Sequence, residues 1–420
     1  MRATIRRPSR LEGTVHLPGD KSISHRALLL NSVADGPARV RGLSPGADVA
    51  STAACLRALG VEIEGGQVVG RGLGGLRPAT APLDCGNSGT TMRLLAGLLA
   101  GQPFVSTLVG DSSLLRRPMD RVAEPLRLMG GYAETAPLRV GGRPLQGLEY
   151  RSPVASAQVK SALLLAGLGA AGPVTVVEPA ATRDHTERML RAMGAPLEIE
   201  GLRVSLAGPV RRLDPLDVEV PGDLSAAAFW LVAAALHGEG NVRLQHVGMN
   251  PGRTGVLEVL ERLGARVHRL RESREGEEPV ADLEVGRAQE LRAFEVGGSE
   301  VAGLIDELPV LAVAAALLPG RSRITGAAEL RVKESDRVAA MASGLRAMGA
   351  DVRELPDGWE IRGPRPLEGT RVDSLGDHRV AMALAVAGLL AEGDTEVDGA
   401  ECVDISYPGF WDQLESLSHW

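Results

Sequence analysis

A short segment near the N-terminus, Pro18 to Arg26, carries residue types that could bind an anion. It reads Pro-Gly-Asp-Lys-Ser-Ile-Ser-His-Arg and runs into an apolar, leucine-rich stretch. Proline and glycine end an extended segment, Asp20 or Ser22 can cap the helix that follows, and the leucines propagate it. The start of such a helix offers unpaired backbone N–H groups, to which Lys21 and the arginine add positive charge. The segment therefore predicts a cradle for a phosphate or carboxylate, with a capped, solvated surface helix as the alternative.

Further polar segments stand where other helices are expected to begin. Gly86-Asn87-Ser88-Gly89-Thr90 exposes backbone N–H groups beside a helix start, which suits a carboxylate or phosphate oxygen. Arg116-Arg117-Pro118 sets guanidinium groups before a proline that fits the first helical turn, and residues 183–187 repeat this device. Ser156-Ala157-Gln158 offers a hydroxyl and an amide. Each of these segments alone is equally explained by an ordinary solvated helix start.

Two segments in the second half of the chain carry acids and bases. In Lys333-Glu334-Ser335-Asp336-Arg337 a spacing of four predicts that the lysine and the arginine share one helix face, with Glu334 on an adjacent one. An exposed, salt-bridged helix explains this pattern almost as well. Asp306 and Glu307 open an apolar segment, and a carboxylate that enters a buried helix needs a partner or a proton. Asp377-His378-Arg379 has the same position in the last part of the chain.

The composition restricts the class of protein. With 420 residues the chain exceeds what one hydrophobic core usually serves, so two domains are expected. The net charge of −7 argues against a nucleic-acid or membrane-surface binder, so any anion site must be a local concentration of positive charge. The three cysteines are far apart and odd in number, which fits a reducing cytosol and indicates no metal site.

The N-terminus lacks an apolar signal segment, and the longest apolar stretches are too short to span a bilayer. We therefore expect a cytoplasmic protein, and a monomer.

Lysine is unusually rare in this sequence. Only three of the 46 basic residues are lysines, at positions 21, 160 and 333. If arginine served wherever a positive charge sufficed, the three lysines mark places that require a compact ammonium group. For Lys160, which lies in no charged motif, chance is an equally good explanation.

A repeat organises the chain. Segments that open an apolar helix begin at residues 20, 87, 156, 223, 306 and 377, with spacings of 67, 69, 67, 83 and 71 residues. Such periodicity indicates one supersecondary unit copied along the chain, here strand, helix, strand, helix and one or two strands. We expect an α/β protein with one domain at 20–220 and a second at 1–19 plus 221–420. The charged run 271–279 is expected to be a solvated hairpin tip.

The motifs taken together resemble the 5-enolpyruvylshikimate-3-phosphate synthase family, within the enolpyruvyltransferases. The resemblance rests on segments that run in register along nearly the whole chain: Gly19–Arg26, Gly86–Arg93, Arg116–Pro118, Ser156–Gln158, Arg331–Arg337 and Gly376–Met382. It implies two domains, each of three βαβαββ repeats, whose helix N-termini face an interdomain cleft that closes on substrate. It also implies transfer of the enolpyruvyl group of phosphoenolpyruvate to the 5-hydroxyl of shikimate 3-phosphate, with release of phosphate, on the shikimate pathway to chorismate and the aromatic amino acids.

The resemblance implies roles for individual residues, without a cofactor or a metal. Both substrates are polyanions. Shikimate 3-phosphate would be held by Lys21, Ser22, Arg26, Ser156, Arg183, Asp306 and Lys333. Phosphoenolpyruvate would be held by Lys21, Gly89, Arg117, Gln158, Arg337 and Arg379. Asn87 and Ala157 would also be substrate-binding residues. The reaction adds the hydroxyl to C2 while C3 takes a proton, and then eliminates phosphate from a tetrahedral intermediate. Asp306 would be the base for the hydroxyl, Glu334 would move the proton at C3, and Lys21 would stabilise developing charge.

One position departs from part of that family. Some members carry a phosphoenolpyruvate-binding lysine just before a Ser/Thr-aromatic-Pro sequence near the C-terminus, and here Ile405 precedes Ser406-Tyr407-Pro408. The departure leaves the affinity for phosphoenolpyruvate, and for the competing inhibitor glyphosate, undecided.

Two alternatives remain open, one an enzyme of the same fold and one from a different class of protein. The related UDP-N-acetylglucosamine enolpyruvyltransferases use a loop cysteine five residues before their Arg-Pro, where this chain has Ser112. A non-enzymatic anion-binding protein on the same scaffold would be expected to have lost Asp306 and Glu334.

Overall fold

The chain divides into two compact units. The computed structural model describes residues 1–135 and 137–420. The N-terminal unit comprises residues 19–220 and 274–278, and the C-terminal unit comprises residues 1–18, 221–273 and 279–420.

The N-terminal unit contains three four-stranded sheets, ordered β14-β3-β5-β4, β6-β7-β9-β8 and β10-β11-β13-β12. In each sheet the first pair of strands is parallel and the others are antiparallel. The predicted repeat is therefore present three times. The elements of the unit are α1 (Lys21–Ser32), β3 (Pro37–Arg41), α2 (Ala47–Ala58), β4 (Glu62–Glu64), β5 (Gln67–Val69), β6 (Leu83–Asp84), α3 (Gly89–Ala100), β7 (Val105–Val109), η1 (Leu114–Arg116), α4 (Asp120–Leu128), β8 (Ala133–Thr135), β9 (Leu138–Gly141), β10 (Gln146–Arg151), α5 (Ala157–Gly167), β11 (Ala171–Val177), α6 (His185–Ala192), β12 (Leu197–Glu200), β13 (Arg203–Leu206) and β14 (Val218–Glu219).

The C-terminal unit repeats this plan with sheets ordered β16-β17-β15-β2-β24, β18-β19-β21-β20 and β1-β23-β22. The N-terminal strands take part in it, since β1 pairs with β23 and β2 pairs with β15 and β24. Its elements are β1 (Arg2–Ile5), β2 (Arg10–Val15), α7 (Leu224–Leu236), β15 (Gly240–Gly248), α8 (Gly255–Leu263), β16 (Val267–Glu275), β17 (Glu278–Gly286), β18 (Glu295–Val296), η2 (Gly298–Gly303), α9 (Leu308–Leu317), β19 (Gly320–Ile324), η3 (Ala328–Val332), α10 (Arg337–Ala347), β20 (Asp351–Leu355), β21 (Gly358–Gly363), β22 (Arg371–Asp373), α11 (His378–Leu390), β23 (Thr395–Asp398), η4 (Ala400–Ile405), α12 (Phe410–Leu417) and β24 (Ser418–His419).

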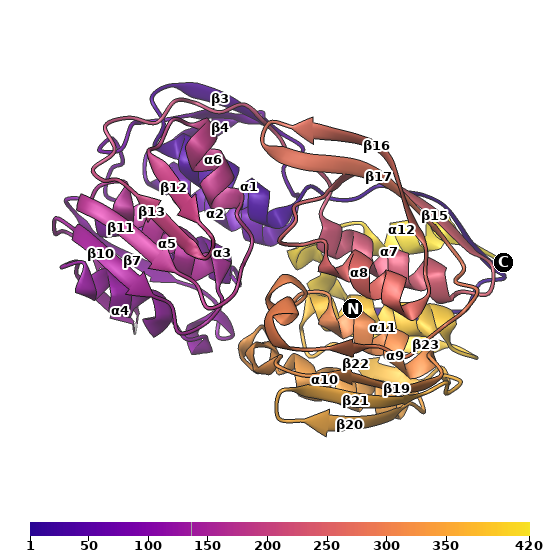
Figure 1. Ribbon diagram of the computed structural model, residues 1–420. Coiled ribbons are helices and arrows are strands. Elements are labelled where there is room, and N and C mark those ends of the chain that lie inside the picture. The colour runs from indigo at the N-terminus through magenta and orange to yellow at the C-terminus, as the bar shows by residue number, and fades with distance from the viewer. Residues whose placement is uncertain (136) are drawn as a thin grey trace. The chain divides into compact units, whose positions relative to one another are not determined.

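Each unit has its own aliphatic core, built around the first helix of each repeat. Four of these helices, α3, α7, α9 and α11, are apolar on nearly all sides, the pattern of a fully buried helix. Figure 1 shows the sheets of each unit lying over its helices. Glycine lets two of them approach closely, because a Cβ at Gly97 of α3 would lie 2.1 Å from the Ala162 carbonyl oxygen of α5. The scarcity of aromatic residues is thus matched by close packing of small side chains.

The helix starts follow the predicted segments. The first helix of each repeat is called a central helix here. Five of these six helices follow a capping residue whose side chain accepts a hydrogen bond from the backbone of the first turn: Asp20 before α1, Ser88 before α3, Ser156 before α5, Asp223 before α7 and Asp377 before α11. The sixth, α9, follows Glu307, whose side chain makes no such bond. The chain therefore presents N-terminal backbone groups at the residues that the repeat singled out.

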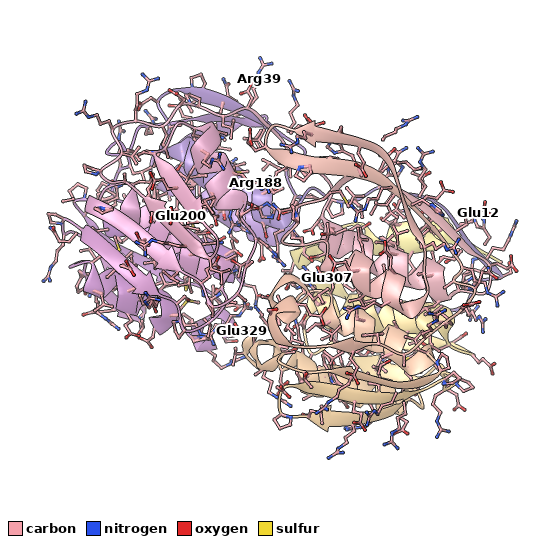
Figure 2. The ribbon with its side chains drawn as sticks, viewed as in Figure 1. Glu12, Arg39, Arg188, Glu200, Glu307 and Glu329 are labelled. Atoms are coloured by element: carbon pink, nitrogen blue, oxygen red, sulfur yellow. The ribbon has the colours of Figure 1, made fainter. Side chains whose placement is uncertain are left out.

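The charged run is the tip of the hairpin β16–β17, as expected, and residues 271–274, 276 and 277 are exposed. Glu278 is the exception: it is only 6 % exposed and its Oε1 lies 2.7 Å from Nδ1 of His185. Arg188, labelled in Figure 2, donates to the Glu277 carbonyl. These contacts explain why residues 274–278 group with the N-terminal unit rather than with the second domain, where the sequence had put them.

Two further observations concern the described part of the chain. None of its helices has the length and apolar character needed to cross a membrane. All three cysteines are buried free thiols.

Candidate active site

The start of α1 gathers four of the predicted ligands. The Lys21 ammonium lies 2.9 Å from a carboxylate oxygen of Asp48, a buried residue of α2 that the sequence reasoning did not single out. The Arg183 guanidinium donates to the Ser22 hydroxyl over 3.3 Å. Arg26, one turn further along, is 3 % exposed. Positive charge and the N-terminal end of a helix therefore lie together in the N-terminal unit, as an anion site requires.

A second group of predicted ligands surrounds the start of α3. The Asn87 amide oxygen accepts a hydrogen bond of 2.7 Å from Nη2 of Arg117. Gly89 leaves room for guanidinium groups, because a Cβ there would lie 2.9 Å from Nη1 of Arg93 and 3.2 Å from Nη1 of Arg117. Gln158, in the first turn of α5, donates to the Thr90 hydroxyl over 2.8 Å and accepts from Arg93. Arg93 belongs to the second matching segment but had been given no role.

A buried chain of side chains joins these two groups. His25 of α1 lies 2.7 Å from the Thr52 hydroxyl, which lies 2.6 Å from the Thr91 hydroxyl. Thr91 in turn donates to the capping Ser88 over 2.7 Å. The network connects α1, α2 and α3 just behind the N-termini that carry the candidate ligands.

In the C-terminal unit Arg337 is the centre of a cluster of carboxylates. Its Nη2 lies 2.7 Å from Glu334, its Nε 2.8 Å from Asp377, and its Nη1 3.6 Å from Asp306. Arg379 approaches the other oxygen of Asp306 at 4.0 Å. Although burial opposes it, the three carboxylates raise the pKa of Arg337. The structure thus brings together the predicted base, the predicted proton carrier and two predicted ligands.

The helix predicted to carry Lys333 is shorter than expected. Helix α10 begins at Arg337 and is capped by Asp336, and Lys333 lies before it, at the end of the short helix η3. The argument that Lys333 and Arg337 share a helix face was therefore wrong. Because Asp336 accepts the N–H of Ala339, the helix cannot extend back to Glu334.

Lys333 nevertheless has a charged environment. It is partly buried, which lowers the pKa of its ammonium group, and the Asp306 carboxylate opposes that shift. Its ammonium lies 3.8 Å from Glu329.

Ser156 and Ala157 stand at the start of α5 in the N-terminal unit, where the Ser156 hydroxyl accepts a hydrogen bond from the Val159 N–H.

Ile405 occupies the position at which some related sequences carry lysine. It ends the short helix η4 and packs, partly buried, against the core of the C-terminal unit. An aliphatic side chain cannot supply a cationic contact there.

Within the described residues no group of three or more histidine, cysteine, aspartate or glutamate side chains could hold a metal ion. The side chains gathered in both units are instead those that bind anions and move protons.

Comparison with known proteins gives one consistent result. The family described as EPSP synthase (3-phosphoshikimate 1-carboxyvinyltransferase) matches residues 5–414. A 3-phosphoshikimate 1-carboxyvinyltransferase of Synechococcus sp. (strain WH7803) is 54 % identical over 424 residues, covering 97 % of this chain and 96 % of its own. The enzyme of that name from Herpetosiphon aurantiacus is 51 % identical and covers 99 % of both chains.

Solved structures agree with these sequence relatives. A structure of EPSP synthase from Acinetobacter baumannii, 42 % identical, superposes with a TM-score of 0.87 and covers 100 % of this chain and 98 % of its own. The α/β fold expected from the sequence is confirmed by this match.

Proposed function

The chain belongs to the EPSP synthase (3-phosphoshikimate 1-carboxyvinyltransferase) family, and we propose that the residues gathered at its helix N-termini carry out that reaction. The enzyme transfers the enolpyruvyl group of phosphoenolpyruvate to the 5-hydroxyl of shikimate 3-phosphate and releases phosphate, a step of the shikimate pathway. Both substrates are polyanions, so a local concentration of arginine, lysine and helix N-termini suits a chain whose overall charge is negative.

Shikimate 3-phosphate is bound in this proposal by residues of both units. Lys21, Ser22, Arg26 and Arg183 supply cations and a hydroxyl around the start of α1, and Arg183 already contacts Ser22. The remaining ligands, from the start of α5 and from the C-terminal unit, are Ser156, Ala157, Asp306 and Lys333.

Phosphoenolpyruvate is bound by the second group of residues. The contact between Asn87 and Arg117 and the close approach of the Arg93 and Arg117 guanidinium groups to Gly89 support this assignment, because they gather cations beside a helix start that suits a small phosphate or carboxylate. Lys21 also belongs to this set. The other proposed ligands are Gln158, Arg337 and Arg379.

The cluster around Arg337 supports the catalytic roles. Two guanidinium groups beside Asp306 favour its ionised form, which a general base needs. In the addition step the 5-hydroxyl oxygen bonds to C2 of phosphoenolpyruvate, its proton passes to Asp306, and C3 takes a proton from Glu334. In the elimination step C3 returns a proton to Glu334, the C2–phosphate bond breaks, and Lys21 stabilises the developing negative charge.

An assay for inorganic phosphate, released from phosphoenolpyruvate, tests the proposal directly. Inorganic phosphate should form only when shikimate 3-phosphate and phosphoenolpyruvate are both present. UDP-N-acetylglucosamine in place of shikimate 3-phosphate should give none, and turnover with it would transfer the assignment to the related enolpyruvyltransferases.

We also infer that the enzyme acts as a monomer in the cytoplasm. The three free, buried thiols support a reducing compartment. Light scattering of the purified protein tests the monomer, since a mass near 88 kDa, roughly twice the 44.0 kDa of the chain, would contradict it.

A further inference from the structure

Arg26 is held in place by neutral oxygen atoms. Its Nε donates to the Thr186 hydroxyl over 2.6 Å, its Nη2 to the Ser161 hydroxyl over 2.8 Å, and its Nη1 to the Ser22 carbonyl over 2.9 Å. The two hydroxyls also bond to each other, at 2.7 Å. A guanidinium has five N–H donors, so these contacts fix its orientation and leave donor capacity for a ligand.

The positive charge of Arg26 is not paired directly. In the described part of the chain, carboxylates act on it only through longer-range attraction. Burial lowers the pKa of Arg26 to about 10, and the strongest opposing influence is the carboxylate of Glu187. Arg183 adds to the lowering, while Asp20 and Glu278 oppose it weakly. Glu187 follows Thr186 in helix α6, so the carboxylate that acts most strongly on Arg26 belongs to the residue next to one of its direct contacts.

Lys160 binds that carboxylate. Its ammonium lies 2.6 Å from Oε1 of Glu187 and 2.7 Å from Oε2 of Glu178, and all three side chains are at most 4 % exposed. Glu178 has a second donor, the Thr182 hydroxyl. The other oxygen of Glu187, Oε2, is buried and makes no hydrogen bond to any residue that the structure describes. Glu187 therefore depends on Lys160 and has an acceptor to spare.

We propose that Lys160 is a positioning residue for the anion site at Arg26, because it holds the Glu187 carboxylate and keeps it from forming an ion pair with the guanidinium. The inference rests on the proposed function, in which Arg26 binds shikimate 3-phosphate. Without the ammonium, Glu187 loses the cation that holds it, and its carboxylate is the negative charge that acts most strongly on Arg26. A buried pair of these two would neutralise the charge that the substrate must meet.

The choice of lysine over arginine follows from the same geometry. Two carboxylates lie within 2.7 Å of a single nitrogen atom of α5, one from α6 and one from the residue directly after β11, and all three side chains are buried. A compact ammonium with three donors suits this position, whereas a planar guanidinium needs more room. This explains one of the three lysines in a chain that otherwise uses arginine.

Calorimetric titration with shikimate 3-phosphate tests the proposal on proteins whose folding is checked by circular dichroism. Lys160→Met should bind the ligand about ten- to a hundred-fold more weakly, the loss expected when a charged partner is neutralised. The double variant Lys160→Met/Glu187→Gln should return to within about threefold of the wild type. It removes one positive and one negative charge, so the net charge of the cluster is that of the wild type.

Two single variants complete the design. Glu187→Gln alone should bind shikimate 3-phosphate as tightly as the wild type or more tightly, and it decides the question if Lys160→Met does not fold. Thr175→Val is the matched control: it breaks a hydroxyl pair of 2.8 Å with Ser205 in the same unit, away from Arg26, and should leave the affinity unchanged.

The outcomes separate the proposal from a purely structural role. A double variant that binds as weakly as Lys160→Met, a Lys160→Met protein with wild-type affinity, or weaker binding by Glu187→Gln would each overturn it. A wild-type protein that does not bind shikimate 3-phosphate would overturn the proposed function, and this inference with it.

Discussion

Asp306 has the surroundings of a general base, and its removal should affect turnover more than binding. Asp306→Asn keeps the shape and a hydrogen-bonding group but cannot take a proton, so kcat should fall by roughly two to four orders of magnitude. Arg337 keeps its contacts with Glu334 and Asp377, so the affinity for shikimate 3-phosphate should change little. Steady-state kinetics and calorimetric titration measure the two effects. Asp412→Asn, at an exposed site on α12, is the control.

Near-normal turnover of Asp306→Asn would remove this residue from the mechanism. An equal loss of turnover and of shikimate 3-phosphate affinity would instead make it a ligand without a role in proton transfer.

The guanidinium groups of Arg93 and Arg117 lie so close to Gly89 that a methyl group at this position would crowd them. A Cβ at this position must displace Arg93 and Arg117 by a few tenths of an ångström, and Arg117 is a proposed phosphoenolpyruvate ligand. In Gly89→Ala we expect the KM for phosphoenolpyruvate to rise about threefold or less. Glyphosate, the longer competitive inhibitor of this family, should lose about tenfold in affinity, because the added methyl group would project toward the longer ligand and spare the shorter phosphoenolpyruvate.

Kinetics with glyphosate as inhibitor check this prediction. Gly74→Ala is the matched control, since a Cβ there meets no atom within 4 Å. Equal losses for phosphoenolpyruvate and glyphosate would mean that Gly89 does not discriminate between them.

At the scale of the elements, helix α1 carries a histidine that should make stability depend on pH. His25 is fully buried, and its burial together with the charges of Lys21 and Arg26 lowers its pKa well below 6.5. Below about pH 6.5 the imidazole is protonated in the unfolded chain but stays neutral in the folded chain. The free energy of unfolding therefore decreases as the pH is lowered. Between pH 7.5 and pH 5.5 this group should cost about 1.4 kcal/mol of unfolding free energy.

Urea unfolding of the wild type and of His25→Asn at the two pH values measures this contribution. The asparagine can retain the hydrogen bond to Thr52 but does not titrate, so its loss of stability on acidification should be smaller by that amount. The other histidines are common to both proteins. The same pH dependence in both would show that His25 does not remain neutral in the folded state.

Helix starts could be predicted from the sequence, whereas contacts between repeats could not. The repeat identified the N-termini of the central helices because their capping residues and apolar runs are local signals. The failure at Lys333 was also local, since Asp336 could have been identified as a cap. By contrast, the approach of Asp377 to Arg337 joins residues 40 positions apart on different helices, and no spacing rule predicts it. The ion pair between Lys160 and Glu187 was missed for the same reason, although the rarity of lysine had already singled out Lys160.

At the scale of the whole molecule, each unit has a separate core and holds only part of the proposed ligand set. We therefore expect the ligand-free protein to unfold in two calorimetric transitions, one for each unit. Shikimate 3-phosphate is proposed to contact Arg26 and Arg183 in one unit and Asp306 and Lys333 in the other. At about 100 times its Kd, it should stabilise the folded state by about 2.7 kcal/mol.

Because residues of both units bind this one ligand in the proposal, shikimate 3-phosphate should raise both transition temperatures. Scanning calorimetry with and without the ligand measures the shifts. Inorganic phosphate at the same concentration is the control, since it can engage cations of only one group at a time and should shift the transitions less. If shikimate 3-phosphate raises only the transition of the N-terminal unit, Asp306 and Lys333 do not bind it, and the base must be sought elsewhere.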